Sequence, residues 1–73
     1  MTGEEWVRRF AAELGDEAPD QEELDEILKL ASIAAHASER TAAPIACWIG
    51  GRTGRSAASL RDVAKNVNPG AQA

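Results

Sequence analysis

The chain has 73 residues, of which 44% are hydrophobic and 27% charged, and its formal net charge is −4. A domain this short hides only about 60% of the surface that its unfolded chain exposes, so an enclosed substrate cavity between two lobes is excluded. The acidic balance argues against nucleic-acid binding, because that affinity comes largely from neutralised phosphates. One cysteine and one histidine provide neither an internal disulfide nor a structural zinc site, and we expect no metal and no cofactor.

The charge is unevenly placed along the chain. Residues 1–40 hold 11 acids and 4 bases (−7), whereas residues 41–73 hold 1 acid and 4 bases (+3). We interpret this asymmetry as mutual attraction of the two halves, with contact between the basic half and a small anion as the alternative. The first residues do not resemble a secretory leader, and the longest apolar run is too short to span a bilayer. We therefore expect a soluble, cytoplasmic protein that makes no membrane contact.

The first helix is predicted over residues 3–14. Thr2 followed by Glu5 fits a capping box, in which each side chain accepts a backbone amide at the helix start. Apolar residues then recur at the spacing of one helix face, namely Trp6, Val7, Phe10, Ala11 and Leu14. Gly15 suits the left-handed residue that commonly ends a helix.

The second helix is predicted over residues 20–39, with Asp20 as its N-terminal cap. One broad apolar face holds Leu24, Ile27, Leu28, Ala31, Ala34, Ala35 and Ser38, and an adjoining face holds Leu30, Ile33 and Ala37. Because two faces are apolar, we expect this helix to contact two neighbours.

Pro44 predicts a break in the helix and a restart, because inside a continuous helix it would clash with the carbonyl of Arg40. The third helix is therefore predicted over residues 43–51, with Thr41 or Ala43 as its cap and Pro44 in its first turn.

The third helix is apolar on every side, which is typical of a helix in the centre of a domain. We therefore expect Trp48 and its neighbours between Ile45 and Ile49 to be shielded from water. Gly50 and Gly51 are expected to end this helix.

The fourth helix is predicted over residues 57–67, capped by Ser56 or by Ser59 with Asp62. Its apolar stripe consists of Leu60, Val63, Ala64 and Val67. The fold class that follows is all-α, a compact four-helix domain over residues 1–68 with a flexible C-terminal tail at 69–73.

His36 and Arg40 lie four residues apart, and we expect them to share one helix face. They are candidate anion-binding residues, together with Arg52 and Arg55 from the segment GGRTGRS, whose amides could meet a phosphate. The alternative is that His36 and Arg40 only stabilise the bend before Pro44, and that the glycine-rich segment is a simple helix–helix loop.

Cys47 has no base near it in the sequence, although His36 could approach it in space. A reactive thiol needs a lowered pKa and some exposure. We therefore interpret Cys47 as a buried small hydrophobic residue, and we predict no catalytic residues.

The segment AHASERTAAPIACWIGG carries a family resemblance, through His36, Arg40, an Ala-Ala-Pro run and a following glycine. It resembles a small actinobacterial family of uncharacterised helical domains, which occur alone or appended to molybdenum-cofactor guanylyltransferases. The N-terminal EEWVRRFAAELG is similar in a looser way. The resemblance implies a helical fold and a link to molybdopterin nucleotide chemistry, without the transferase activity.

The function expected from these observations is that of a non-enzymatic accessory or protein-interaction domain. Its partner would be a second copy or a molybdenum-cofactor biosynthesis enzyme. The alternative is a small-anion or nucleotide-binding domain that uses His36 and Arg40.

Overall fold

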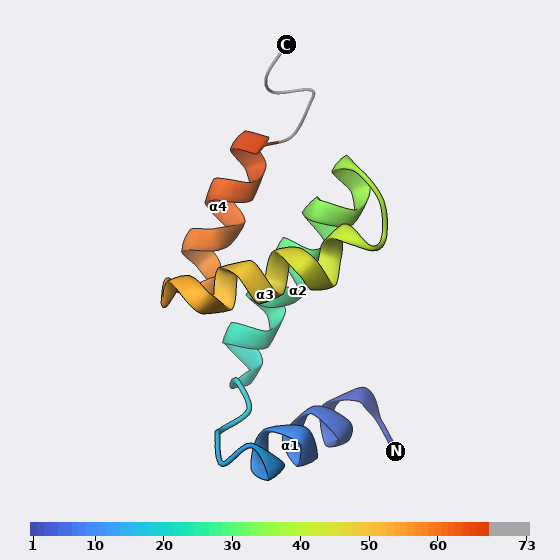
Figure 1. Ribbon diagram of the computed structural model, residues 1–73, viewed down its shortest axis with the longest axis vertical. Helices are drawn as coiled ribbons and strands as arrows, with labels where there is room; N and C mark the ends of the chain where they lie inside the picture. The colour runs from blue at the N-terminus through green and yellow to red at the C-terminus, as the bar shows by residue number, and fades with distance from the viewer. Residues whose placement is uncertain (68–73) are drawn as a thin grey trace.

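The computed structural model describes residues 1–67, which form four helices joined by short links (Figure 1). They are α1 (Gly3–Glu13), α2 (Gln21–Ala37), α3 (Ala42–Thr53) and α4 (Ala57–Val67). Residues 1–67 contain no strand, so the predicted all-α, four-helix architecture is confirmed. The tail predicted at 69–73 lies outside the described residues.

Local capping sets where the first two helices begin. The Thr2 hydroxyl accepts a hydrogen bond from the Glu5 amide at 3.1 Å, and the Glu5 carboxylate accepts one from the Thr2 amide at 3.3 Å. Asp20 caps α2 by accepting from the Glu23 amide at 2.8 Å. These bonds satisfy amides that have no partner within the helix, and they confirm the predicted starts.

The break between α2 and α3 is present, but it begins earlier than predicted. α2 ends at Ala37, two residues before the expected end, and Ser38 is its C-terminal cap. Thr41 occupies the N-cap position of α3 without a side-chain hydrogen bond. Pro44 lies in the first turn of α3, as predicted, because its missing amide and fixed φ are tolerated there.

The predicted end of α3 at Gly50 and Gly51 is wrong. The helix continues to Thr53 and is capped by Gly54, whose φ of 74° lies in the left-handed region. Glycine lowers helix propensity without breaking the hydrogen-bond ladder. The stop therefore falls where the chain adopts a left-handed residue, which glycine does without steric cost.

α2 is the central element of the fold. It packs against both α3 and α4, which confirms that it has two neighbours. α3 crosses α2, and α4 leads away from the C-terminal end of α3 (Figure 1). α1 lies beyond the N-terminal end of α2. Ser56 begins α4 by accepting from the Ser59 amide at 3.2 Å, so Ser56 is the cap of that helix.

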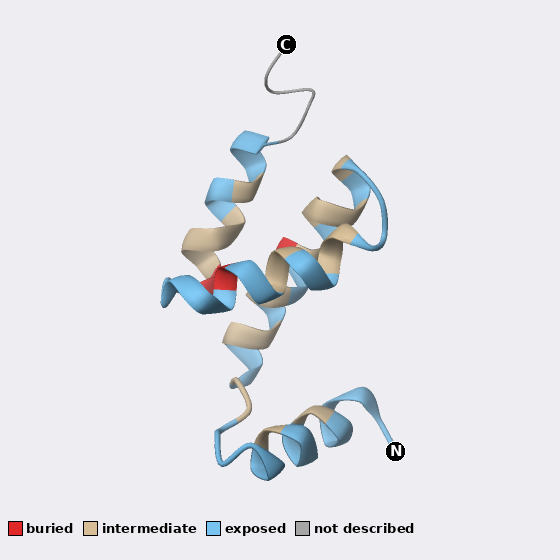
Figure 2. Ribbon diagram, in the orientation of Figure 1, coloured by how far each residue is buried: buried red, intermediate tan, exposed pale blue. Residues whose placement is uncertain are grey.

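The tightest packing lies where α2, α3 and α4 meet. Leu30 of α2 and Ala57 of α4 are only 5% and 3% exposed, and they are the buried hydrophobic residues of the described chain (Figure 2). Gly50 of α3 is also buried, and a Cβ atom there would lie 2.6 Å from Leu60 Cδ1. Gly50 thus lets α3 and α4 approach closely.

The expectation that α3 is shielded on every side is wrong. Trp48 is 64% exposed, Ile45 58% and Ile49 54%. α3 lies on one side of α2, and no described element covers its outer side (Figure 2). A chain of this size has too few residues to surround one helix with others.

Candidate functional site

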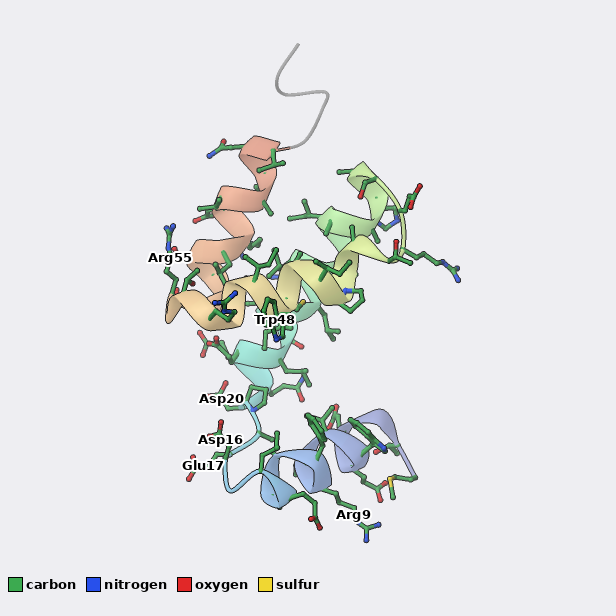
Figure 3. All side chains as sticks on the ribbon, viewed as in Figure 1. Arg9, Asp16, Glu17, Asp20, Trp48 and Arg55 are labelled. Carbon is green, nitrogen blue, oxygen red and sulfur yellow. The ribbon has the colours of Figure 1, made fainter. Side chains whose placement is uncertain are left out.

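The outer side of α3 is an apolar surface that ends in an arginine. Ile45, Trp48, Ile49 and Arg52 follow one another at spacings of three, one and three residues, so they line one stripe of the helix. We call these four residues the α3 face. The ring of Trp48, labelled in Figure 3, stacks with Arg52, whose guanidinium carbon lies 4.6 Å from the ring centroid. This distance is within the range of a cation–π interaction.

The α3 face has the composition of a protein-binding surface. Tryptophan and arginine are enriched among the residues that dominate binding energy in protein interfaces. Large exposed apolar residues that are contiguous, rather than scattered, mark interaction sites. The sequence does carry this stripe, but α3 is apolar all round, so its pattern does not indicate which side faces water.

A second exposed apolar surface lies on α1. The rings of Trp6 and Phe10 stack with centroids 5.1 Å apart and an interplanar angle of 18°. They are 56% and 52% exposed, and Leu14 at the end of the helix is 67% exposed. We call these three residues the α1 ridge. Together they form a helical i, i+4, i+8 series without a partner in the described chain.

An apolar groove of about 640 Å³ opens between α2, α3 and α4. It is lined by residues from the second half of α2, from α3 and from α4. We call it the α2–α4 groove. Its lining residues are mostly aliphatic and small, and include Leu30, Ile33, Ala46, Ile49, Leu60 and Val63.

His36 and Arg40 do not share a helix face, in contrast to the prediction. α2 ends at Ala37, so Arg40 lies in the link between α2 and α3, where it is exposed. The Nδ1 of His36 lies 2.7 Å from the carbonyl oxygen of Ser32 and 3.1 Å from its hydroxyl. This imidazole nitrogen is therefore engaged one turn back within α2, away from the bend.

Arg52 and Arg55 lie at the opposite end of α3 from His36 and Arg40. A helix of 12 residues is about 18 Å long, so one small anion cannot contact both pairs. Arg55 Nε donates to Ser59 Oγ at 2.8 Å, and this bond holds its guanidinium beside α4 (Figure 3). The structure therefore does not bring the four candidate anion ligands together.

Cys47 is half-buried in α3. Desolvation by burial raises the pKa of its thiol, which lowers the fraction of the nucleophilic thiolate. No hydrogen bond joins Cys47 to His36 in residues 1–67. Within the same residues, no three His, Cys, Asp or Glu side chains are grouped so that they could hold a metal ion. The geometry favours a packing role for Cys47.

None of the described helices combines the length and the apolar character that crossing a membrane requires. A protein-family model described as "Domain of unknown function (DUF6457)" matches residues 1–73. No curated protein and no solved structure matches the chain.

Proposed function

Because the chain belongs to the DUF6457 family, a domain of unknown function, we propose its role from its surfaces: it is a non-enzymatic accessory domain that binds a protein partner through the α3 face. The observation that carries the proposal is the 64% exposure of Trp48. Leaving so large an apolar side chain in water forgoes about 1.5–3 kcal/mol of burial free energy. A partner that covers it would recover much of that free energy.

The charge around the α3 face specifies the partner's surface. Residues 41–67, which include α3 and α4, hold 4 bases and 1 acid, and Arg52 lies at the end of the face itself. A complementary partner would present an apolar pocket for Trp48 with carboxylates at its rim, because matched charges steer association. The face is small, so contacts beyond α3 are needed to reach the area of about 800 Å² per partner that stable interfaces bury.

The resemblance of the central segment makes a molybdenum-cofactor guanylyltransferase the first partner to test. We propose that the domain acts as an accessory to that enzyme and takes no part in its chemistry. The raised pKa of the Cys47 thiol and the dispersal of the four candidate anion ligands support a role in binding rather than in catalysis.

The experiment is a binding titration of the purified chain with the guanylyltransferase of the same host. Trp48→Ala is expected to weaken binding by about 30-fold or more, as a central tryptophan does in other interfaces. Trp6→Ala is the matched control, because Trp6 is exposed to a similar extent, 56%, on a different helix. It is expected to leave the affinity unchanged.

Two results would contradict this proposal. If both tryptophan variants bind like the original chain, the α3 face is not the docking surface. If the original chain does not bind the guanylyltransferase at all, the proposed partner is wrong. A capture from host lysate that depends on Trp48 would then assign a different protein to the α3 face.

A further inference from the structure

The α1 ridge and the α2–α4 groove are two apolar surfaces of matching kind. The ridge projects Trp6, Phe10 and Leu14 from one side of a helix. Recognition of an amphipathic helix in an apolar groove uses anchors at such spacings. The groove, at about 640 Å³, is within the volume range of about 300–1,000 Å³ that is typical of binding pockets.

The ridge and the groove of one chain do not meet in the structure. α1 lies beyond the first turn of α2, whereas the groove is lined by the second half of α2, from Leu30 to Ser38 (Figure 1). On its other side, α1 faces the start of α2, where Val7 lines a different groove together with Leu24 and Leu28. The α1 ridge is thus left for a surface outside its own chain.

The charges of the two regions are complementary. Residues 1–20, which include α1 and the link after it, hold 6 acids and 2 bases, a net charge of −4. Residues 41–67 hold 4 bases and 1 acid, a net charge of +3, and Arg55 lines the groove. Asp16 and Glu17 lie along the link that leads from α1 (Figure 3). The opposite charges of residues 1–20 and residues 41–67 favour the approach of the α1 ridge to the groove.

The area available reaches the minimum for a specific dimer interface. Aromatic side chains bury about 150–250 Å² each, and slightly more than half of Trp6 and Phe10 is still exposed. With Leu14, each ridge offers roughly 350 Å², and the groove loses roughly 200 Å² when it is covered. Two reciprocal contacts therefore remove roughly 1,100 Å² from water, which clears the limit of about 1,000 Å² for a biological interface.

We propose that two copies of this chain form a dimer by exchanging their α1 helices, with the α1 ridge of each copy seated in the α2–α4 groove of the other. The contact is the same in both directions, so the assembly closes at two copies. This inference goes beyond the proposed partner binding, and it uses the α3 face only at Ile49, which also lines the groove. The dimer leaves Ile45, Trp48 and Arg52 of the α3 face free for that partner, because none of them lines the groove.

A disulfide-trapping experiment distinguishes exchange between copies from closure within one copy. One chain carries Phe10→Cys and the other carries Val63→Cys, a groove residue that is 42% exposed, both with Cys47→Ser. After mild oxidation of the mixture, we expect a cross-linked heterodimer. The chain that carries both substitutions tests the alternative. If its cross-link forms only within a single chain, or if no cross-link forms in either experiment, the proposal is overturned.

Light scattering on the full chain provides the second test. We expect a mass twice that of the 7.7 kDa chain. Replacing Trp6 and Phe10 together by alanine is expected to raise the dimer dissociation constant by about 30-fold or more. Helix content should not change, because both side chains are exposed within one chain. Trp48→Ala is the control and should leave the dimer intact. A monomer for the original chain, or a dimer lost only in Trp48→Ala, would overturn the proposal.

Discussion

The carboxylate of Glu23 in α2 accepts a hydrogen bond from the backbone amide of Ala57, the first residue of α4, at 3.1 Å. The two residues are 34 positions apart in the sequence. Ala57 is 3% exposed, so its amide has little access to water. A side chain from α2 therefore caps the start of α4, and this hydrogen bond fixes the first residue of α4 against α2.

Glu23→Ala is expected to lower the free energy of unfolding by about 1 kcal/mol, the usual cost of removing a helix cap. Glu22→Ala is the matched control, since Glu22 lies in the same first turn of α2 but is exposed. Its effect should stay within about 0.5 kcal/mol. Urea unfolding of the two variants measures the difference. Equal losses would show that the bond to Ala57 contributes nothing beyond the favourable position of an acid at a helix start.

The two adjacent glycines of α3 are expected to respond differently to alanine. At Gly51 a Cβ would meet nothing within 4 Å, so Gly51→Ala should stabilise the chain by about 1 kcal/mol through helix propensity. At Gly50 the same Cβ would lie 2.6 Å from Leu60 Cδ1, and Leu60 must move.

Gly50→Ala should therefore be at least about 1 kcal/mol less stable than Gly51→Ala, because overpacking offsets the propensity gain. Thermal unfolding of both variants checks this order. Gly50→Val should lower stability further, since it adds two methyl groups at the contact. If Gly50→Ala and Gly51→Ala are equally stabilising, α3 and α4 do not approach as closely as the structure shows.

The ion pair between Arg61 of α4 and Glu26 of α2 is partly shielded, with side-chain exposures of 25% and 19%. The Arg61 Nε atom is buried without a hydrogen-bond partner. The ion pair with Glu26 is therefore the main interaction between the guanidinium and α2. Glu26→Gln should lower the free energy of unfolding by about 1–2 kcal/mol, because a charge-assisted bond is lost.

Glu4→Gln provides the comparison for Glu26→Gln. Its partner is Arg8 at 3.9 Å, and the two side chains are 58% and 63% exposed. Solvent screening limits the loss there to about 0.5 kcal/mol or less. Denaturant titrations at low and high salt should show this small effect vanishing with salt while the Glu26 effect persists. A Glu26→Gln variant as stable as Glu4→Gln would contradict the shielding of the pair.

The Cys47 thiol should react slowly with alkylating reagents. Burial raises the pKa of this thiol, so at mildly alkaline pH the folded chain holds less thiolate than a free cysteine does. Alkylation followed by mass spectrometry should show a slow rate in buffer and an ordinary rate in urea. Alkylation as fast in buffer as in urea would show that the thiol is activated or freely accessible.

The same shift in pKa predicts how stability depends on pH. The unfolded thiol ionises first as pH rises, so the unfolded state then binds fewer protons than the folded state. Stability should therefore decline as pH rises through the ordinary pKa of a free thiol. Cys47→Ser, which removes the ionisable group, should remove this part of the decline.

Much of the fold could be predicted from the sequence because its signals are local. The Thr2–Glu5 capping box and the Asp20 cap each act within three residues of a helix start, and both form as expected. Pro44 prevents α2 and α3 from forming one continuous helix, because it lacks an amide hydrogen and its ring would clash with the preceding turn. Such effects depend on neighbours along the chain, so the residues themselves determine them.

The geometry of the candidate site could not be predicted from local sequence signals. His36 and Arg40 would share a face only if α2 continued past Ala37, and it does not. A helix that is apolar on all sides, like α3, has no preferred side to bury. The outward position of Trp48 was therefore decided by which neighbours the chain could supply.

By itself, the sequence determined that the chain forms four helices and where the first two begin. Only the tertiary structure decided that α2 is central, that Gly50 lies against Leu60, and that Trp48 faces water. The physical reason is that hydrogen bonds at helix ends involve adjacent residues. Burial depends instead on how much surface distant parts of the chain cover, and three helices around one short core leave the outer side of α3 open.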